Sequence, residues 1–329
     1  MSYIGWMIVR WKIFGGLYLG WGIGANDSAN IFGTAIATNS ISFKRAVWLI
    51  AFFSVLGAVV GGPLVISNLN FDPQSATQGS ALIATLSAAI AVTIVTILGI
   101  PASTSQAAIG GIMGIAILRA GFHEVDWSKF WKMFSCWVFT PIGSAIITVI
   151  LYFVLSRFVK RFVKSMSRRN QVYRILLIVS GSYGAYSLGA NNVAVTTASY
   201  YQAGMFGAKS ILTARIACLV GGLAIALGAL TYSKNVIETV GNKITILDPF
   251  SAVVTVFAHS ITLEIFTHFG IPVSSSQAIV GSIIGIGLIQ GANTIRLKIL
   301  IFIFVGWLMT PISGAIIAYL LGSVFRSHI

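Results

Sequence analysis

The stretch PASTSQAAIGGIMGI at residues 101–115 returns as PVSSSQAIVGSIIGI at residues 272–286, with nine of the fifteen positions identical. Two further pairs keep the same order. GANDSAN at 24–30 matches GANNVAV at 189–195, and WVFTPI at 137–142 matches WLMTPI at 307–312. The offsets are 171, 165 and 170 residues. Self-similarity at a nearly fixed period indicates an internal duplication, so the chain consists of two homologous halves.

The composition places this duplicated chain in a lipid bilayer. Of its 329 residues, 57% are hydrophobic and 9% are charged, and the mean hydropathy is +0.91. A soluble domain carries about 25% charged residues, so a chain this apolar cannot cover a surface that faces water. Long apolar stretches recur throughout, which excludes a secreted protein whose single short apolar core belongs to a signal peptide. The sequence predicts a multi-pass protein of the cell membrane.

Each half contains five apolar blocks. They run near 13–37, 46–66, 80–98, 106–118 and 133–155, and near 175–200, 211–231, 250–267, 277–290 and 299–321. A full span needs about 20 apolar residues, so the short fourth block either spans or returns as one arm of a re-entrant hairpin. Both choices give an odd number of crossings, and repeats with odd crossings lie in opposite orientations. The expected fold is an all-α polytopic membrane protein of two inverted-topology repeats with re-entrant or broken helical hairpins. Its expected parts are a first repeat at 1–155, a basic cytoplasmic linker at 156–174 and a second repeat at 175–329.

The linker at 156–174 holds seven of the 21 basic residues and no acidic one, in a chain of net charge +14. Cytoplasmic loops of membrane proteins carry such an excess, so we expect the linker inside and both termini outside. Contact with anionic lipid headgroups is compatible with this position. No nucleic-acid recognition fold surrounds the basic run, and no nucleic-acid partner is expected.

Asp27 is conspicuous because an ionisable residue within a membrane segment is costly and commonly functional. Its neighbours Gly24, Asn26, Ser28 and Asn30 are small or carry amides, and such residues disfavour a regular helix. The segment is therefore expected to unwind and to line a cavity. Close helix packing through small residues is the alternative. It explains the glycines but not the carboxylate.

The two Pro-x-Ser-x-Ser-Gln segments each predict the start of a helix at membrane depth. Ser103 with Gln106, and Ser274 with Gln277, fit the capping-box pattern. The free N–H groups of such a helix end have no water to bind, and the helix dipole adds about half a positive charge, so an anion is a suitable ligand. Two copies brought together by the duplication indicate one shared oxyanion site. Its further hydroxyl donors would be Ser103, Thr104, Ser105, Ser274, Ser275 and Ser276.

Glu264 is the second acidic residue within an apolar block, and His259 and His268 flank it. A glutamate that is paired with a histidine or kept protonated is the structural interpretation. Binding of a coupling ion or a proton is the functional one. The sequence does not decide between them.

The GAND-type pair and the P-x-S-[ST]-S-Q pair resemble the signatures of the inorganic phosphate transporter family, which comprises sodium- or proton-coupled phosphate symporters with sulfate-permease relatives. The resemblance covers essentially the whole chain, and the order of the motifs is specific. It implies a central site between helical hairpins. The positions that it implies as anion ligands are Asp27, Ser103, Thr104, Ser105, Asn192, Ser274, Ser275 and Ser276. Those that it implies near the coupling cation are Asn26, Asn30, Gln106, Asn191 and Gln277.

The second half departs from the family pattern at two positions. Asn192 replaces an aspartate, and Val195 stands where the first half has Asn30. The site therefore has one negative charge and one amide fewer. This leaves the number of coupling ions open, and it also bears on the choice between phosphate and sulfate.

The function favoured by these observations is import of inorganic phosphate by symport with Na⁺ or H⁺, and the alternative is a sulfate permease of the same family. An anion channel is less favoured, because a channel does not need a buried acid beside its anion. No hydrolase or P-loop motif is present, so neither an enzyme nor an ATP-driven pump is expected. No cofactor is expected besides the coupling cation. The expected partners are phosphate or sulfate, Na⁺ and membrane lipids, and a homodimer is a candidate assembly, although the sequence does not give the oligomeric state.

Overall fold

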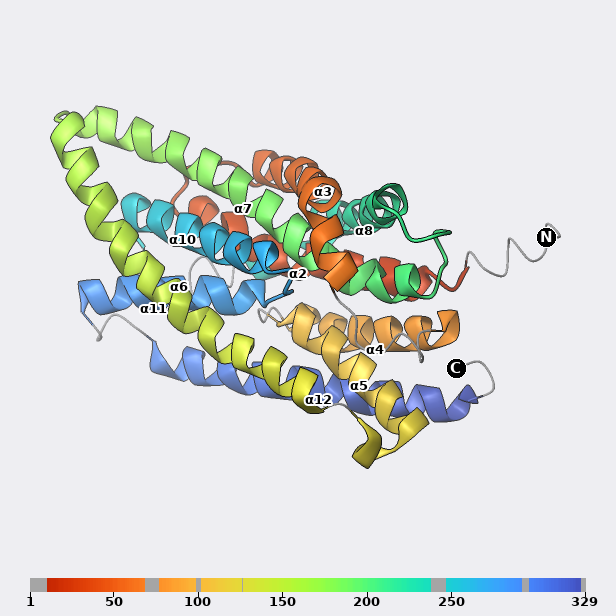
Figure 1. The fold of residues 1–329 in the computed structure, drawn as a ribbon. Coiled ribbons are helices and arrows are strands. Elements are labelled where there is room, and N and C mark those ends of the chain that lie inside the picture. Colours follow the sequence, from red (N-terminus) through yellow and green to blue (C-terminus); the bar gives the residue numbers. More distant parts are fainter. Residues whose placement is uncertain are drawn as a thin grey trace.

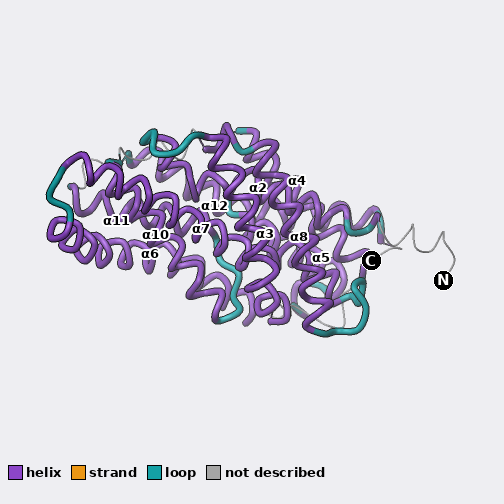
Figure 2. The backbone as a smooth tube through the Cα atoms, turned by 90° about the horizontal axis from the view of Figure 1, so that it is seen from above, coloured by secondary structure: helices purple, strands orange, loops and turns teal. Residues whose placement is uncertain are grey.

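The computed structural model describes residues 11–68, 77–98, 102–125, 127–237, 247–291 and 296–326. Within these ranges all regular structure is helical, and the all-α fold class is confirmed (Figures 1 and 2). The helices are α2 (Phe14–Ala37), α3 (Phe43–Asn68), α4 (Gln78–Ile97), α5 (Thr104–Ala120), the 3₁₀ turn η1 (Phe122–Glu124), α6 (Trp127–Phe162), α7 (Met166–Gln202), α8 (Ile211–Tyr232), α10 (Pro249–His268), α11 (Ser275–Gln290) and α12 (Leu297–Val324).

Each α-helix corresponds to one of the predicted apolar blocks, although α6 and α7 extend several residues beyond theirs. Six of the described helices, α3, α4, α6, α8, α10 and α12, are long and apolar enough to cross a bilayer. The outward faces of α6 and α12 carry large exposed apolar side chains. Such faces suit hydrocarbon rather than water, which agrees with a polytopic membrane protein.

The short fourth block of each half is one arm of a hairpin. Figure 1 shows α4 and α5 extending from the end of the molecule at which α2 begins and α12 ends. The pair α10 and α11 extends from the opposite end, where α6 joins α7. The described residues at the inner ends of the hairpins, Thr96 and Ala102 in one and Thr267 and Val273 in the other, are buried. Opposed entry of the hairpins is what inverted repeats would produce, and the twofold relation itself stays a prediction.

The two halves share one core, because α2 packs on α8 and α3 packs on α7. A Cβ atom at Gly24 would lie 1.8 Å from the Ile225 carbonyl oxygen, and one at Gly189 would lie 1.9 Å from that of Ser54. Only glycine permits these backbone contacts. The expected repeats at 1–155 and 175–329 thus pack into one core, and their boundaries stay a prediction.

The Thr-Pro-Ile segments make the same kind of contact between halves. Pro311 of α12 packs on Gly110 of α5, and Pro141 of α6 packs on Gly281 of α11. A Cβ atom would lie 2.1 Å from the Pro311 oxygen and 2.2 Å from the Pro141 oxygen. Each hairpin is therefore braced by the last long helix of the other half.

The basic segment 156–174 is mostly helical. Helix α6 continues to Phe162 and α7 begins at Met166, so residues 163–165 alone lie outside a helix. The Arg169 Nε donates to the Val163 carbonyl at 2.7 Å across this connection. The side to which it faces in a membrane stays a prediction.

Candidate functional site

The GANDSAN and GANNVAV segments remain helical, and the expectation that the first unwinds is wrong. Helix α2 runs without a break through 24–30, as α7 does through 189–195. Glycine favours unwinding only where nothing packs against it, and Gly24 instead lies against the backbone of α8. Asn26, Asp27 and Asn30 each also form at least one tertiary hydrogen bond from the intact helix, so the helix need not open to bring these side chains to their partners.

Asn26 fixes the tip of the first hairpin. Its Oδ1 accepts a hydrogen bond from the Ala102 N–H at 2.9 Å, and its Nδ2 donates to Thr96 Oγ1 at 3.0 Å. All three residues are buried. One side chain thus holds the end of α4 and the residue that leads into α5.

Asn191 fixes the second tip with the same pattern. Its Oδ1 accepts from the Val273 N–H at 2.8 Å, and its Nδ2 donates to Thr267 Oγ1 and the Ile271 carbonyl, both at 3.0 Å. Thr267 and Val273 are the duplicated counterparts of Thr96 and Ala102. The structure gives both asparagines a positioning role. Their role near a coupling cation stays a prediction.

Asp27 meets the start of α5. Thr104, the first residue of that helix, donates from Oγ1 to Asp27 Oδ2 at 2.9 Å. The predicted capping box is wrong at this end, because the Ser103 side chain forms no cap. Asn26 instead holds the backbone just before this helix, by accepting a hydrogen bond from the Ala102 N–H. At the other tip, Ser274 Oγ accepts from the Gln277 N–H at 3.3 Å, which is half of a capping box.

The two halves meet at Ser275. The Asn30 Nδ2 of α2 donates to Ser275 Oγ of α11 at 3.2 Å. The first polar segment therefore touches the second hairpin tip as well as its own. Helix α2 thus contacts both hairpin tips, through Asp27 and Asn30, and a single site shared by the tips stays a prediction.

All thirteen predicted site residues are at most 4% exposed. Several of their polar atoms have no hydrogen-bond partner within the described chain, although buried polar groups are paired in the great majority of cases. Such atoms mark a place where a ligand would supply the missing partners. They are Asp27 Oδ1, Asn30 Oδ1, Ser103 Oγ, Ser105 Oγ, Gln106 Oε1, Gln277 Oε1 and both polar atoms of the Asn192 amide.

His259 contacts one of the predicted site residues, and sequence reasoning considered it only as a neighbour of Glu264. It is fully buried on α10, and its Nε2 lies 2.9 Å from Ser275 Oγ. A lone histidine in an apolar block was the available signal. The contact depends on how the hairpin folds back, which spacing alone does not reveal.

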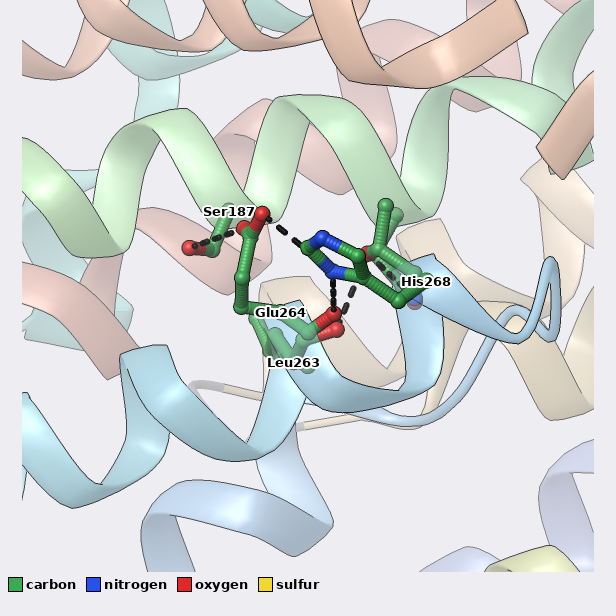
Figure 3. Close-up of polar contacts among 6 residues, drawn as sticks. Ser187, Leu263, Glu264 and His268 are labelled. Carbon is green, nitrogen blue, oxygen red and sulfur yellow. Dashed lines mark hydrogen bonds and ion pairs between the residues drawn. The ribbon is translucent and has the colours of Figure 1, made fainter. Parts of the chain in front are cut away.

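Glu264 lies apart from the hydrogen bonds described above and is partly exposed. Figure 3 shows it between Ser187 of α7 and His268 of its own helix. Ser187 Oγ donates to Glu264 Oε2 at 3.2 Å, and His268 Nδ1 lies 3.7 Å from Oε1. The glutamate is paired with His268, not His259, in agreement with the structural interpretation.

These features define a polytopic, all-helical membrane protein with a buried polar centre between two hairpin tips. The fold matches a solved structure described as the sodium-dependent phosphate transporter, with a TM-score of 0.84 over 98% of this chain and 100% of that chain at 22% identity. The model of the phosphate transporter family matches residues 23–318. The chain belongs to this family.

Two curated relatives are similar over nearly the whole length. A protein of Pyrococcus furiosus that carries the provisional name of a phosphate permease is 28% identical, with 95% of this chain and 94% of that protein covered. The sulfate permease CysP of Bacillus subtilis is 31% identical, with 94% of this chain and 86% of that protein covered.

Proposed function

We propose that this chain imports inorganic phosphate across the cell membrane by symport with Na⁺, with H⁺ as the alternative coupling ion. The similar structure is described as sodium-dependent, and the relative from Pyrococcus furiosus is named for phosphate. The observation that carries the proposal is the set of buried, unpaired polar atoms contributed by both hairpin tips.

The donors of this set suit a tetrahedral oxyanion. The Ser103 and Ser105 hydroxyls are unpaired beside the first turn of α5. Free N–H groups and the helix dipole at such an end favour negative charge. The start of α11 presents a second helix end across the centre. An anion held between the two ends would be reached by donors from both halves.

Asp27 gives the site a reason to prefer phosphate. Its Oδ2 is bonded to Thr104, whereas Oδ1 remains unpaired. At neutral pH phosphate retains a proton that it can donate to a carboxylate, whereas sulfate only accepts. A site built to bond one such group can reject an analogue that lacks it by factors of about 10⁴–10⁵.

The coupling cation would use the unpaired amide oxygens of Asn30, Gln106 and Gln277. Oxygen ligands of this kind suit hard cations. A cation is also needed energetically, because moving a divalent anion into a negative interior costs about 4.6 kcal/mol at 100 mV, at roughly 2.3 kcal/mol for each charge. Two co-transported monovalent cations would cancel this term.

Sulfate transport is the second candidate, and Asn192 is the observation that favours it. The chain is 31% identical to a named sulfate permease and 28% identical to the named phosphate permease. Both polar atoms of the Asn192 side chain are buried and unpaired. An amide can donate to sulfate as readily as it accepts from phosphate. Asn192→Asp should therefore sharpen the preference for phosphate.

The test is uptake of labelled phosphate into proteoliposomes that hold the purified protein. We expect uptake that rises with an inward Na⁺ gradient, or with an inward proton gradient if H⁺ is coupled. Excess sulfate should compete less well than excess phosphate, and Asn192→Asp should widen that gap. If excess sulfate competed as well as excess phosphate, sulfate permease activity would replace the phosphate proposal. Uptake that depends on neither the Na⁺ nor the proton gradient would contradict symport.

A further inference from the structure

His259 has an unusual set of contacts for a buried histidine. Its Nε2 lies 2.9 Å from Ser275 Oγ, and its Nδ1 has no partner within the described chain. Its counterpart in the first half, at the offset of 171 residues, is Ala88 of α4, which has no polar side chain. The imidazole is therefore a polar group that the first hairpin does not have.

The two hairpin tips treat equivalent hydroxyls differently. At the first tip, Thr104 donates its proton to the Asp27 carboxylate. At the second tip, Ser275 is the counterpart of Thr104, and Asn192 stands where Asp27 would be. Ser275 is instead contacted by Asn30 and His259. A hydroxyl that is held by a carboxylate in one half is held by an amide and an imidazole in the other.

The partners of Ser275 determine whether its hydroxyl proton can reach the anion. A serine hydroxyl has one proton and two acceptor positions. The Asn30 amide donates into one acceptor position. If Ser275 donates its proton to His259, only a lone pair remains for the site, and a lone pair repels an oxyanion. If His259 donates instead, both acceptor positions are filled and the Ser275 proton is free to point at the anion.

Nothing else in the described chain competes for the tautomer of His259. The tautomer of a histidine is set by the hydrogen bonds that its two nitrogens make, and Nδ1 makes none. The contact with Ser275 is therefore decisive. An anion that needs a donor from Ser275 favours the form with a proton on Nε2.

We infer that His259 is a positioning residue for the anion: its Nε2–H and the Asn30 amide both donate to Ser275 Oγ and so direct the Ser275 hydroxyl proton into the oxyanion site. The inference rests on the proposed function, because it takes Ser275 as an anion ligand. Hydrogen bonds in such a chain polarise and strengthen one another. In the first half, Asp27 accepts the Thr104 proton. In the second half, where Asn192 stands in place of the aspartate, the imidazole leaves the Ser275 proton available to the anion.

The test is equilibrium binding of labelled phosphate and labelled sulfate to the purified full-length protein. His259→Phe keeps an apolar ring of similar volume and removes the donor. We expect it to weaken binding of the transported anion about fivefold, the size of one ordinary hydrogen bond. His259→Gln, whose amide nitrogen reaches the position of Nε2, should restore affinity to within about twofold.

A double mutant tests whether His259 acts through Ser275. In the Ser275→Ala background, His259→Phe should have no further effect, because two residues that act as one unit are not additive. Thr262→Val is the matched control. Thr262 is also buried on α10, and its hydroxyl donates to the Ala258 carbonyl within the helix at 2.7 Å. That variant should bind like the wild type.

The possible results distinguish failure of the proposed function from failure of the role of His259. Wild-type protein that binds neither anion would refute the proposed function itself. Wild-type binding that His259→Phe leaves unchanged or tightens would refute the role of His259 alone, since tightening would mean that the histidine accepts the serine proton. Additive losses in the double mutant, or failure of His259→Gln to restore affinity, would reduce His259 to a packing residue.

Discussion

Removal of the Asn191 side chain should loosen the second hairpin tip. Asn191→Ala deletes three hydrogen bonds, to the Val273 N–H, Thr267 Oγ1 and the Ile271 carbonyl. Val273 is completely buried, so its N–H would be left without a partner. An orphaned buried group costs about 1–3 kcal/mol, and an ordinary hydrogen bond contributes about 1 kcal/mol. We expect a total destabilisation of about 2–4 kcal/mol.

The loss of these hydrogen bonds should lower both the stability of the protein and its affinity for the anion. If half of the penalty, about 1–2 kcal/mol, falls on the ordered tip, anion affinity should drop by roughly 5- to 30-fold. The melting temperature of the purified protein in detergent should fall by several degrees. Asn26→Ala should behave alike, because Asn26 holds Ala102 and Thr96 with the same geometry.

A suitable control is Ser54→Ala, which removes one hydrogen bond within helix α3 at an equally buried position. It should change stability by less than about 1 kcal/mol. The reasoning would be refuted if Asn191→Ala melted and bound like the control. A large effect of Asn191→Ala with none from Asn26→Ala would show that the two tips are not held equivalently.

Three further predictions follow from the structure. Gly24→Ala should prevent stable folding, because its Cβ would lie 1.8 Å from the Ile225 carbonyl oxygen. The control Gly306→Ala, whose Cβ would meet nothing within 4 Å, should melt like the wild type. Similar melting of the two variants would contradict the packing of α2 on α8. Asp27→Asn should abolish coupled uptake in proteoliposomes while circular dichroism stays unchanged, because it removes charge and keeps shape, and near wild-type uptake would make Asp27 structural. Gln106→Ala and Gln277→Ala should raise the Na⁺ concentration needed for half-maximal uptake more than the phosphate KM, because their oxygens are unpaired; equal changes in both would count against a cation role.

The helices were predictable because hydropathy and turn residues are local signals. The block at 13–37 is helix α2 (Phe14–Ala37), and the block at 250–267 is α10 (Pro249–His268). The start of a helix just after Ser103 was also predictable from its proline and serine pattern. The choice of a hairpin over a span was not, since a 17-residue helix is compatible with either.

The sequence singled out candidate site residues, whose role in binding stays a prediction, but it did not predict most of their contacts. The duplication identified Asp27, Thr104 and Ser275, and the structure joins them to the two hairpin tips. The unwinding expected near Gly24 failed because helix propensity is a weak prior that tertiary packing overrides. The contact of His259 with Ser275 depends on the return of the chain through the hairpin, and no local pattern encodes it.

The claim that both hairpin tips form a single oxyanion site is tested most directly by counting and perturbing that site. Labelled phosphate, or sulfate if that is the transported anion, would be titrated onto purified wild-type protein, Ser105→Ala and Ser276→Ala. We predict one bound anion for each chain, and a loss of affinity of about 10- to 100-fold in both variants, because a hydrogen bond to a charged group is worth about 1.5–3 kcal/mol. Two independent binding events in the wild type, or full affinity in either variant, would contradict a shared site.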